Sequence, residues 1–454
     1  MPTNSPPPSA NLPPLWQQLQ IAAAILLAVR QGRSATAELA AVEPRLRAGV
    51  QSLVFHVLRH LGQAQALRRL LAKKAPAPVV DALLCTSLAL CCGDELPYDG
   101  FVLVDQSVEA AKRQASTKHQ AGFINGCLRR YLRESDALRA QADQDETAKW
   151  NHPTWWISRL KKEYPKQWQQ ILQANNRHAP FTLRVNALTT DLRQYQSALS
   201  AINIESNLAG SFGVTLHKPQ PVQSLPGFEA GWFSVQDGAA QRAAPLLLQG
   251  LMPLDPKKPL RVLDACAAPG GKTAHLIEFA QGVLNQAIDV TAIEMDARRT
   301  DRIHETLNRL NLRAEVVVAD AGDTTSWWDK QLFDAILLDA PCTASGIVRR
   351  HPDVRWLRKE ADITQLATIQ RRLLKALWPL VRPGGRLLYC TCSVFQAEGQ
   401  DQIQTFLAHN TDAQLLASPG HLIPLGRENG TALQDNASVD EDGFFFALLE
   451  KQRA

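Results

Sequence analysis

The chain has 454 residues, of which 45% are hydrophobic and 20% are charged, and its formal net charge is +5. This composition excludes a largely disordered protein, and the length predicts two or three packed domains. The small positive charge permits a polyanionic partner without requiring one. The eight cysteines form no C-x-x-C pair and no regular spacing, which argues against a disulfide scaffold or a zinc ribbon, and we expect no metal site.

The amino end predicts a short tail followed by a helix. Residues 1–14 are rich in Pro, Ser and Asn and predict a disordered tail. Leu15, Leu19, Ala22 and Leu26 recur at helical spacing, which indicates an amphipathic helix. The tail lacks a basic segment, and the apolar run at 21–29 is too short to cross a bilayer. We therefore expect a cytoplasmic protein without a membrane partner. We separately expect it to be a monomer.

Residues 15–149 predict a purely helical domain, because Leu and Ala runs alternate with Pro and Gly and no strand pattern is present. Residues 1–150 contain 17 Lys and Arg against 13 Asp and Glu, so most of the surplus charge lies here. Arg129, Arg130 and Arg133 share one side of a helix in "KHQAGFINGCLRRYLR". This side is either a solvated face, the more common case, or an RNA-binding surface.

Residues 150–235 predict a small α+β subdomain. The strand pattern "FTLRVNAL" is followed by a helix from about Asp191 and by short strands between Pro and Gly turns. Such a module suits RNA docking, with Arg184 and Lys218 as candidates to contact phosphate. A plain connecting subdomain is an equally good interpretation.

Residues 236–454 alternate between strands and helices. The expected strands are "LRVLDAC", "DVTAIEMD", "AEVVVADA", "FDAILLDAP" and "GGRLLYCTC". This alternation is typical of an α/β fold with a doubly wound, Rossmann-like parallel sheet. The terminal "DGFFFALLEK" predicts a further strand at an antiparallel edge.

Ligands of such sheets bind at the carboxyl ends of the strands. "CAAPGGKT" follows the first strand, but it fits neither a Walker A loop nor a dinucleotide-binding motif. Glu294 ends the second strand, where it can accept hydrogen bonds from ribose hydroxyls, and Asp320 ends the third, where it can accept one from an adenine amine. Each acid alone is more often a surface residue, but the set favours a nucleoside cofactor without pyrophosphate, which points to S-adenosylmethionine. The loop residues expected to bind it are Cys266, Ala267, Ala268, Pro269, Gly270, Gly271 and Lys272.

Three motifs together resemble those of the RNA cytosine-C5 methyltransferases of the Sun family: "DACAAPGGKT", "LLDAPCTASGIVRRHP" and "YCTCS". The helical amino half, with "AGFINGCLRRYLR", is similar to the NusB-like RNA-binding domain of the bacterial members that modify 16S rRNA. The resemblance covers nearly the whole chain. It departs from the family pattern at Thr343, where serine is frequent, and at Glu294, where aspartate is usual. A third departure is Cys390, before the Thr-Cys pair, where a small residue is common and to which the resemblance assigns no role.

The resemblance implies a covalent mechanism, because C5 of cytosine is a weak nucleophile until a thiolate adds at C6. It implies that Cys392 is this nucleophile and that Cys342 assists product release. Asp339 is expected to contact both the base edge and the methionine end of the cofactor, with Lys272 orienting the carboxylates. Cys85, Cys91, Cys92 and Cys127 are expected to be inert core residues.

The segment "VRRHPDVRWLRK" directly follows the Pro-Cys motif. Its five Lys and Arg, with His351 and Trp356, suit contacts to the RNA backbone and bases, although a solvated loop is also compatible. Two rival functions stay open: the same chemistry on tRNA or DNA, and a ribosome assembly factor that has kept only the fold. In the DNA enzymes the Pro-Cys thiol attacks, so the intact Thr-Cys motif argues against DNA.

Overall fold

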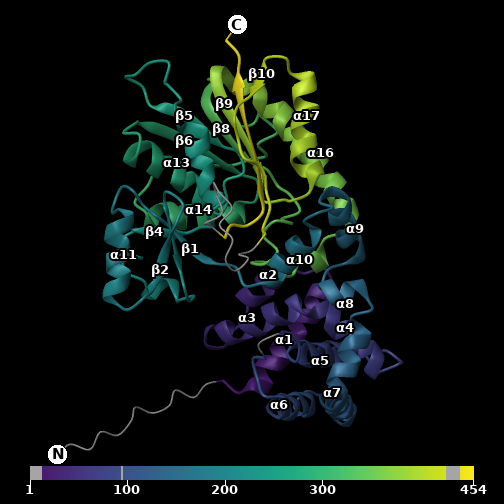
Figure 1. The fold of residues 1–454 in the computed structure, drawn as a ribbon. Coiled ribbons are helices and arrows are strands. Elements are labelled where there is room, and N and C mark those ends of the chain that lie inside the picture. Colours follow the sequence, from purple (N-terminus) through teal and green to yellow (C-terminus); the bar gives the residue numbers. More distant parts are fainter. Residues whose placement is uncertain (1–12, 94–95, 426–439, 454) are drawn as a thin grey trace, which may run out of the picture. The chain divides into compact units, whose positions relative to one another are not determined.

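The computed structural model describes residues 13–93, 96–425 and 440–453 and divides into two compact units (Figure 1). The first unit contains the chain up to Arg177 together with Val348–Arg358, and the second contains His178–Ile347 and the chain from Lys359 onward. Nearly all of the predicted disordered tail lies outside the described residues. Within the described ranges, no helix is both long and apolar enough to cross a membrane.

The first unit is all-helical, as predicted for residues 15–149; residues 150–177, which the sequence assigned to the α+β subdomain, also belong to this unit. The helix α5 is its centre and packs against α1, α3, α4, α6 and α7. The predicted apolar stripe of α1 is buried at Leu19, Ala22 and Leu26. All four cysteines of this unit are buried, and burial raises the pKa of Cys91 to about 12. The helices are α1 Leu15–Arg30, α2 Ala35–Ala40, α3 Pro44–Arg59, α4 Leu61–Leu71, α5 Pro78–Ala89, α6 Gly100–Lys112, α7 Ala121–Ala142, α8 Glu146–Trp150, α9 Thr154–Glu163, α10 Trp168–Asn176 and, from the later segment, α15 Val354–Leu357.

The segment Val348–Arg358 is an integral part of the first unit. The Arg355 guanidinium is fully buried and donates hydrogen bonds to the backbone oxygens of Asn151 at 3.0 Å and Asn175 at 2.7 Å. The indole of Trp356 donates to the Leu58 carbonyl at 2.8 Å. The segment is therefore anchored by donors that satisfy backbone carbonyls inside the unit.

A backbone amide and a side chain of the first unit also donate hydrogen bonds to this segment. The amide of Ala35 donates to the Asp353 carboxylate at 2.9 Å, and Arg59 donates to the carbonyl of Arg349 at 3.0 Å. The side chains of both Arg349 and Arg355 are buried. The prediction that these two arginines contact RNA or lie in a solvated loop is therefore wrong, because the first unit encloses them.

The second unit begins with a four-stranded antiparallel sheet in the order β2-β3-β1-β4. Its strands are β1 Phe181–Val185, β2 Ser206–Ala209, β3 Gly213–Leu216 and β4 Phe233–Val235. The helix α11, Leu192–Ala201, covers one face through Tyr195 and Leu199, which join the core of Leu183 and Val214. This arrangement confirms the predicted α+β subdomain.

The larger sheet has the order β10-β12-β9-β8-β5-β6-β7, and β11 pairs with β12. Five neighbouring strands of this sheet are mutually parallel, as predicted: β9, β8, β5, β6 and β7. Helices α12, α13 and α14 pack on one face, while α16 and α17 pack on the other. The elements are α12 Ala243–Leu248, β5 Leu260–Asp264, α13 Gly271–Gly282, β6 Ile288–Glu294, α14 Ala297–Arg309, β7 Glu315–Val318, β8 Phe333–Asp339, α16 Glu360–Leu377, β9 Val381–Thr391, α17 Gln400–His409, β10 Ala413–Leu415, β11 Gly420–Leu422 and β12 Phe444–Lys451.

The terminal strand β12 is antiparallel to β9, as expected, but it is not at the edge of the sheet. The short strand β10 pairs with its outer side, from Ala413 opposite Lys451 to Leu415 opposite Leu449. The expectation of an edge strand is therefore wrong. The strand β10 has only three residues, which is too short for an alternating pattern to be recognised in the sequence.

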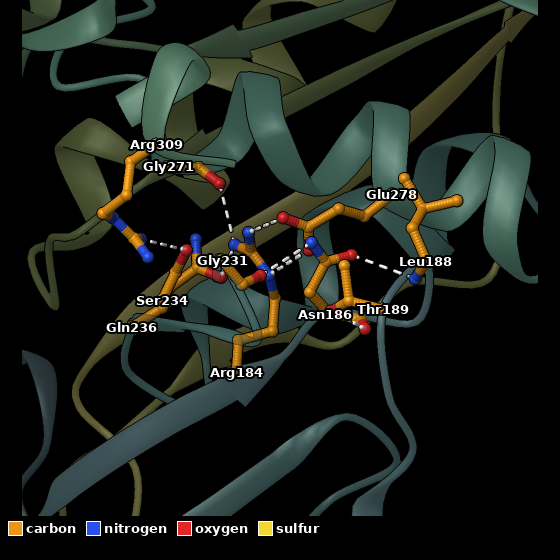
Figure 2. A network of polar contacts seen from close by, with 10 residues as sticks. All are labelled: Arg184, Asn186, Leu188, Thr189, Gly231, Ser234, Gln236, Gly271, Glu278 and Arg309. Atoms are coloured by element: carbon orange, nitrogen blue, oxygen red, sulfur yellow. Dashed lines mark hydrogen bonds and ion pairs between the residues drawn. The ribbon is translucent and has the colours of Figure 1, made fainter. Parts of the chain in front are cut away.

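A buried ion pair joins the small sheet to the larger one (Figure 2). The guanidinium of Arg184, on β1, donates two hydrogen bonds of 3.0 Å to the carboxylate of Glu278 on α13, and both side chains are almost fully buried. Arg184 also donates to the Gly271 carbonyl at 2.8 Å, at the first turn of α13. The prediction that Arg184 contacts RNA phosphate is therefore wrong, because its donors face the protein interior. Lys218 is exposed, so its contact with phosphate stays a prediction.

Glu278→Ala should lower the free energy of unfolding by about 3–5 kcal/mol, because it leaves the Arg184 guanidinium buried without its partner. Hydrogen exchange of the α13 amides measures this effect locally, which matters in a protein of two units. The double replacement Arg184→Met and Glu278→Leu should cost less than Glu278→Ala alone, since no buried charge remains. Equal costs for the single and double replacements would contradict this account.

Candidate active site

Two thiols from distant motifs meet at the carboxyl ends of two neighbouring strands. Cys342 follows β8 and Cys392 follows β9, and the parallel register of these strands places Asp339 opposite Cys390. The sulfur atoms of Cys342 and Cys392 are 3.4 Å apart, and both residues are partly exposed. The structure therefore brings together two thiols that the sequence separates by fifty positions.

The backbone fixes the turn that carries Cys342. The amide of Ala340 donates to the Cys390 carbonyl, and that of Gly346 to the Cys392 carbonyl, each at 2.9 Å. A Cβ atom on Gly346 would lie 2.0 Å from the carbonyl oxygen of Gly443. Only glycine allows this approach, so the turn is held against β9 on one side and residue 443 on the other.

The environment of Cys342 favours its protonated form. Its hydrogen bond with Cys392 and its burial raise the pKa of Cys342 well above the usual value for a thiol. At neutral pH Cys342 is therefore a thiol and can donate its proton toward the sulfur of Cys392. Two sulfur atoms in contact, one of them a proton donor, suit chemistry in which a thiolate forms and later departs.

Asp339 lies between a lysine and a third cysteine. Lys272 donates to one carboxylate oxygen of Asp339 at 2.7 Å, and the Cys390 thiol donates to the other at 3.4 Å. Burial opposes the charge of Lys272, but the Asp339 carboxylate together with Cys390 and Cys392 outweighs burial and raises the lysine pKa. Burial raises the pKa of Cys390, so this residue is a thiol and fixes the orientation of Asp339. The sequence had given Cys390 no role.

The loop Cys266–Gly271 connects β5 to α13. Gly270 has a φ of 93°, and a Cβ atom there would lie 3.1 Å from the Cα of Ile303 on α14. The side chains of Arg299 and Thr306 donate to the carbonyls of Ala268 and Pro269, at 3.2 and 2.9 Å. Glycine is thus required at residue 270, and α14 sets the path of the loop.

The two acids predicted to bind a nucleoside both have protein partners. Glu294 is 5% exposed, accepts a hydrogen bond from the Asp296 amide at 3.0 Å and pairs with Arg299 at 3.3 Å. Asp320 receives two hydrogen bonds from Arg372, at 2.9 and 3.1 Å, and these lower the pKa of its carboxyl group. Protein partners therefore orient both carboxylates.

Sequence reasoning missed two buried acids of this region. Asp264 ends β5, is fully buried, and accepts a hydrogen bond from Thr273 at 2.7 Å; burial raises its pKa to about 6. Its position at a strand end directly before the loop was a signal in the sequence. Glu398 is also fully buried, and no motif had marked it. Among the described residues, no cluster of three or more His, Cys, Asp or Glu side chains could hold a metal ion.

Known families match three parts of the chain. Residues 17–133 match the NusB family, and residues 152–223 match the ferredoxin-like domain of proteins similar to the methyltransferases RsmF and RsmB. Residues 251–450 match the family described as 16S rRNA methyltransferase RsmB/F. These matches confirm both the predicted fold class and the family resemblance of the motifs.

Individual proteins resemble nearly the entire chain. The ribosomal RNA small subunit methyltransferase B of Vibrio vulnificus is 39% identical over 420 residues, which cover 90% of this chain and 92% of that protein. Its namesake in Pseudomonas syringae pv. tomato is 40% identical over 443 residues, which cover 95% of this chain and 96% of that protein.

Solved structures share the fold. The crystal structure of PH0851 has a TM-score of 0.73 at 24% identity, and the alignment covers 95% of this chain and 99% of that one. A methyltransferase homologue from Pyrococcus horikoshii has a TM-score of 0.54 at 26% identity, covering 68% of this chain and 98% of its own.

Proposed function

Because the chain belongs to the 16S rRNA methyltransferase RsmB/F family, we propose that it transfers a methyl group from S-adenosylmethionine to C5 of a cytosine in 16S rRNA. The observation that best supports this chemistry is the 3.4 Å contact between the sulfur atoms of Cys342 and Cys392. Cys342 follows β8, which pairs with β5, and Cys392 follows β9, which pairs with the other side of β8. The strand β5 leads into the loop Cys266–Gly271. We place the enzyme in the bacterial cytoplasm with its rRNA substrate.

The residues around this loop suit S-adenosylmethionine. Gly270 and Gly271 carry no side chains, so the backbone of the loop can contact the ligand directly. The buried Glu294 carboxylate would accept hydrogen bonds from the ribose hydroxyls, Asp320 from the adenine amine, and Asp339 from the amino group of the methionine part. When bound, this cofactor supplies an electrophilic methyl group.

The thiolate of Cys392 is the nucleophile of the proposed reaction. It adds to C6 of the cytosine, which forms a carbon–sulfur bond and makes C5 electron-rich. Asp339, held by Lys272 and Cys390, faces the N3 and N4 edge of the base. After C5 is methylated, a base removes the C5 proton, the carbon–sulfur bond breaks, and its electron pair returns to the sulfur of Cys392.

Cys342 serves this last step. Besides its hydrogen bond with Cys392, burial also raises the pKa of Cys342, so this residue still holds a proton when the sulfur of Cys392 leaves C6. From 3.4 Å it can donate that proton to the departing sulfur. The two thiols are thus needed at different times, the first for attack and the second for release.

Replacing the two cysteines separately should therefore give different products. Cys392→Ala should abolish methylation and form no covalent complex, since nothing can add to C6. Cys342→Ala should attack and methylate, then release slowly, so protein bound to RNA accumulates on a denaturing gel. An adduct that accumulates with Cys392→Ala and disappears with Cys342→Ala would reverse the two roles, as would be expected of a DNA-type mechanism.

Glu294→Ala should weaken the binding of S-adenosylmethionine by about 1.5–3 kcal/mol, the range for hydrogen bonds to charged groups. Calorimetry measures this affinity directly, and Glu305→Ala on the exposed side of α14 is the matched control. An unchanged affinity would remove Glu294 from the cofactor site. Absence of binding to the unaltered protein would instead favour an assembly factor that has kept only the fold.

We also propose that the first unit recruits RNA through Arg129, Arg130 and Arg133, which are all exposed on α7. Their joint replacement by Gln should weaken RNA binding and lower the slope of log affinity against log salt by up to about 3. Replacing the exposed Lys73 and Lys74 by Gln is the control. Substitution is preferable to deletion because Val348–Arg358 is packed within this unit. Equal slopes for both variants would contradict the assignment.

A further inference from the structure

Glu398 is a fully buried acid that contacts the residue after each of the two thiols. One carboxylate oxygen accepts the backbone amide of Thr343 at 2.8 Å, and the other accepts the hydroxyl of Ser393 at 2.6 Å. The hydroxyl of Thr343 also donates to the second oxygen. Thr343 follows Cys342 and Ser393 follows Cys392, so one carboxylate joins the two turns.

Gln370 extends this link to the other side of Cys342. Its amide nitrogen donates to the carbonyl of Pro341 at 2.9 Å and to the Glu398 carboxylate at 3.3 Å. Both neighbours of Cys342 in the chain are therefore tied to Glu398, one directly and one through Gln370. Four donor groups converge on the two carboxylate oxygens.

The backbone of Glu398 is fixed as well. Its carbonyl oxygen accepts hydrogen bonds from the hydroxyls of Tyr389 at 2.8 Å and Thr391 at 3.3 Å, both on β9. Ser345 adds a contact of 2.9 Å between its hydroxyl and that of Ser393. The acid is thus anchored to the strand that carries Cys392 while its side chain reaches the turn that carries Cys342.

We propose that Glu398 is the positioning residue of the thiol pair: by holding Thr343 and Ser393 together it keeps the sulfur atoms of Cys342 and Cys392 in contact. This role rests on the proposed function, in which one thiol attacks and the other assists its departure. Glu398 touches neither substrate nor cofactor in this scheme, and it acts only through the two turns.

Besides holding the two turns together, Glu398 acts on Cys342 through its negative charge, which favours the protonated thiol. It contributes to raising the pKa of Cys342, after the hydrogen bond to Cys392 and burial. Burial raises the pKa of Glu398 itself, and its hydrogen bonds oppose that rise. A glutamine at this position would keep an acceptor for the Thr343 amide and could donate to the two hydroxyls, so it would keep the link without the charge.

Cross-linking of the two thiols tests the geometry without RNA or cofactor. Diamide takes two protons and two electrons from Cys342 and Cys392 and leaves a disulfide, which mass spectrometry of the fragments can follow over time. Glu398→Ala should slow this reaction at least about tenfold, a factor equal to the loss of one hydrogen bond to a charged group. Glu398→Gln should restore most of the rate.

Asp334→Asn is the matched control for a general loss of stability. Asp334 is at the opposite end of β8, where its carboxylate binds the Arg261 amide at 2.8 Å and pairs with Arg382. This replacement should lower the melting temperature and leave the cross-linking rate unchanged. A rate that falls equally in Glu398→Ala and Asp334→Asn would show a mere stability effect and would overturn the proposal.

If Glu398→Ala does not fold, Thr343→Val and Ser393→Ala are the alternative variants, because each removes one hydroxyl that donates a hydrogen bond to the Glu398 carboxylate. Each should slow cross-linking, and the double variant should be slower than either. A wild-type rate in every folded variant would overturn the positioning role. A failure of the unaltered protein to methylate cytosine would defeat only the proposed function, because the cross-linking rate does not depend on methylation.

Discussion

The parallel pairing of β8 with β9 is the constraint on which the whole candidate site depends. Because Asp339 lies opposite Cys390, the turns that follow these strands emerge side by side, and Cys342 meets Cys392. A shift of one residue in this register would send every side chain to the other face of the sheet. The strands themselves are buried on both faces by helices, which fixes the register through packing.

Around this pairing, buried polar groups set the positions of Asp339 and of the two thiols. Lys272 and Cys390 each bind one oxygen of Asp339, and Glu398 spans the turns behind the thiols. Buried groups of this kind are costly unless every partner is present, so they stabilise one arrangement and penalise others. The arrangement of Cys342, Cys392 and Asp339 therefore relies on hydrogen bonds to buried groups.

Two arginines that the sequence offered as RNA contacts are buried and bind the protein instead. Arg184 and Arg355 both stand in segments whose composition suits RNA, yet each has its guanidinium buried and donating to partners in the protein. Arg184 connects the small sheet to the first turn of α13, and Arg355 anchors Val348–Arg358 in the first unit. Arg129, Arg130 and Arg133, by contrast, are exposed on α7 and keep the capacity to meet phosphate.

The sequence by itself determined the fold class, the family and the helical or strand character of most elements, because apolar periodicity and compact motifs are local properties. It also indicated the loop Cys266–Gly271, since glycine at a tight turn is visible in the chain. Only the tertiary structure decided that Cys390 contacts Asp339, that Glu398 joins the two thiol turns, and that β10 covers β12. The first two contacts join residues about fifty positions apart, and a local pattern does not indicate which distant donor will bind a buried acceptor. The third involves a strand of three residues, which is too short to produce a recognisable pattern.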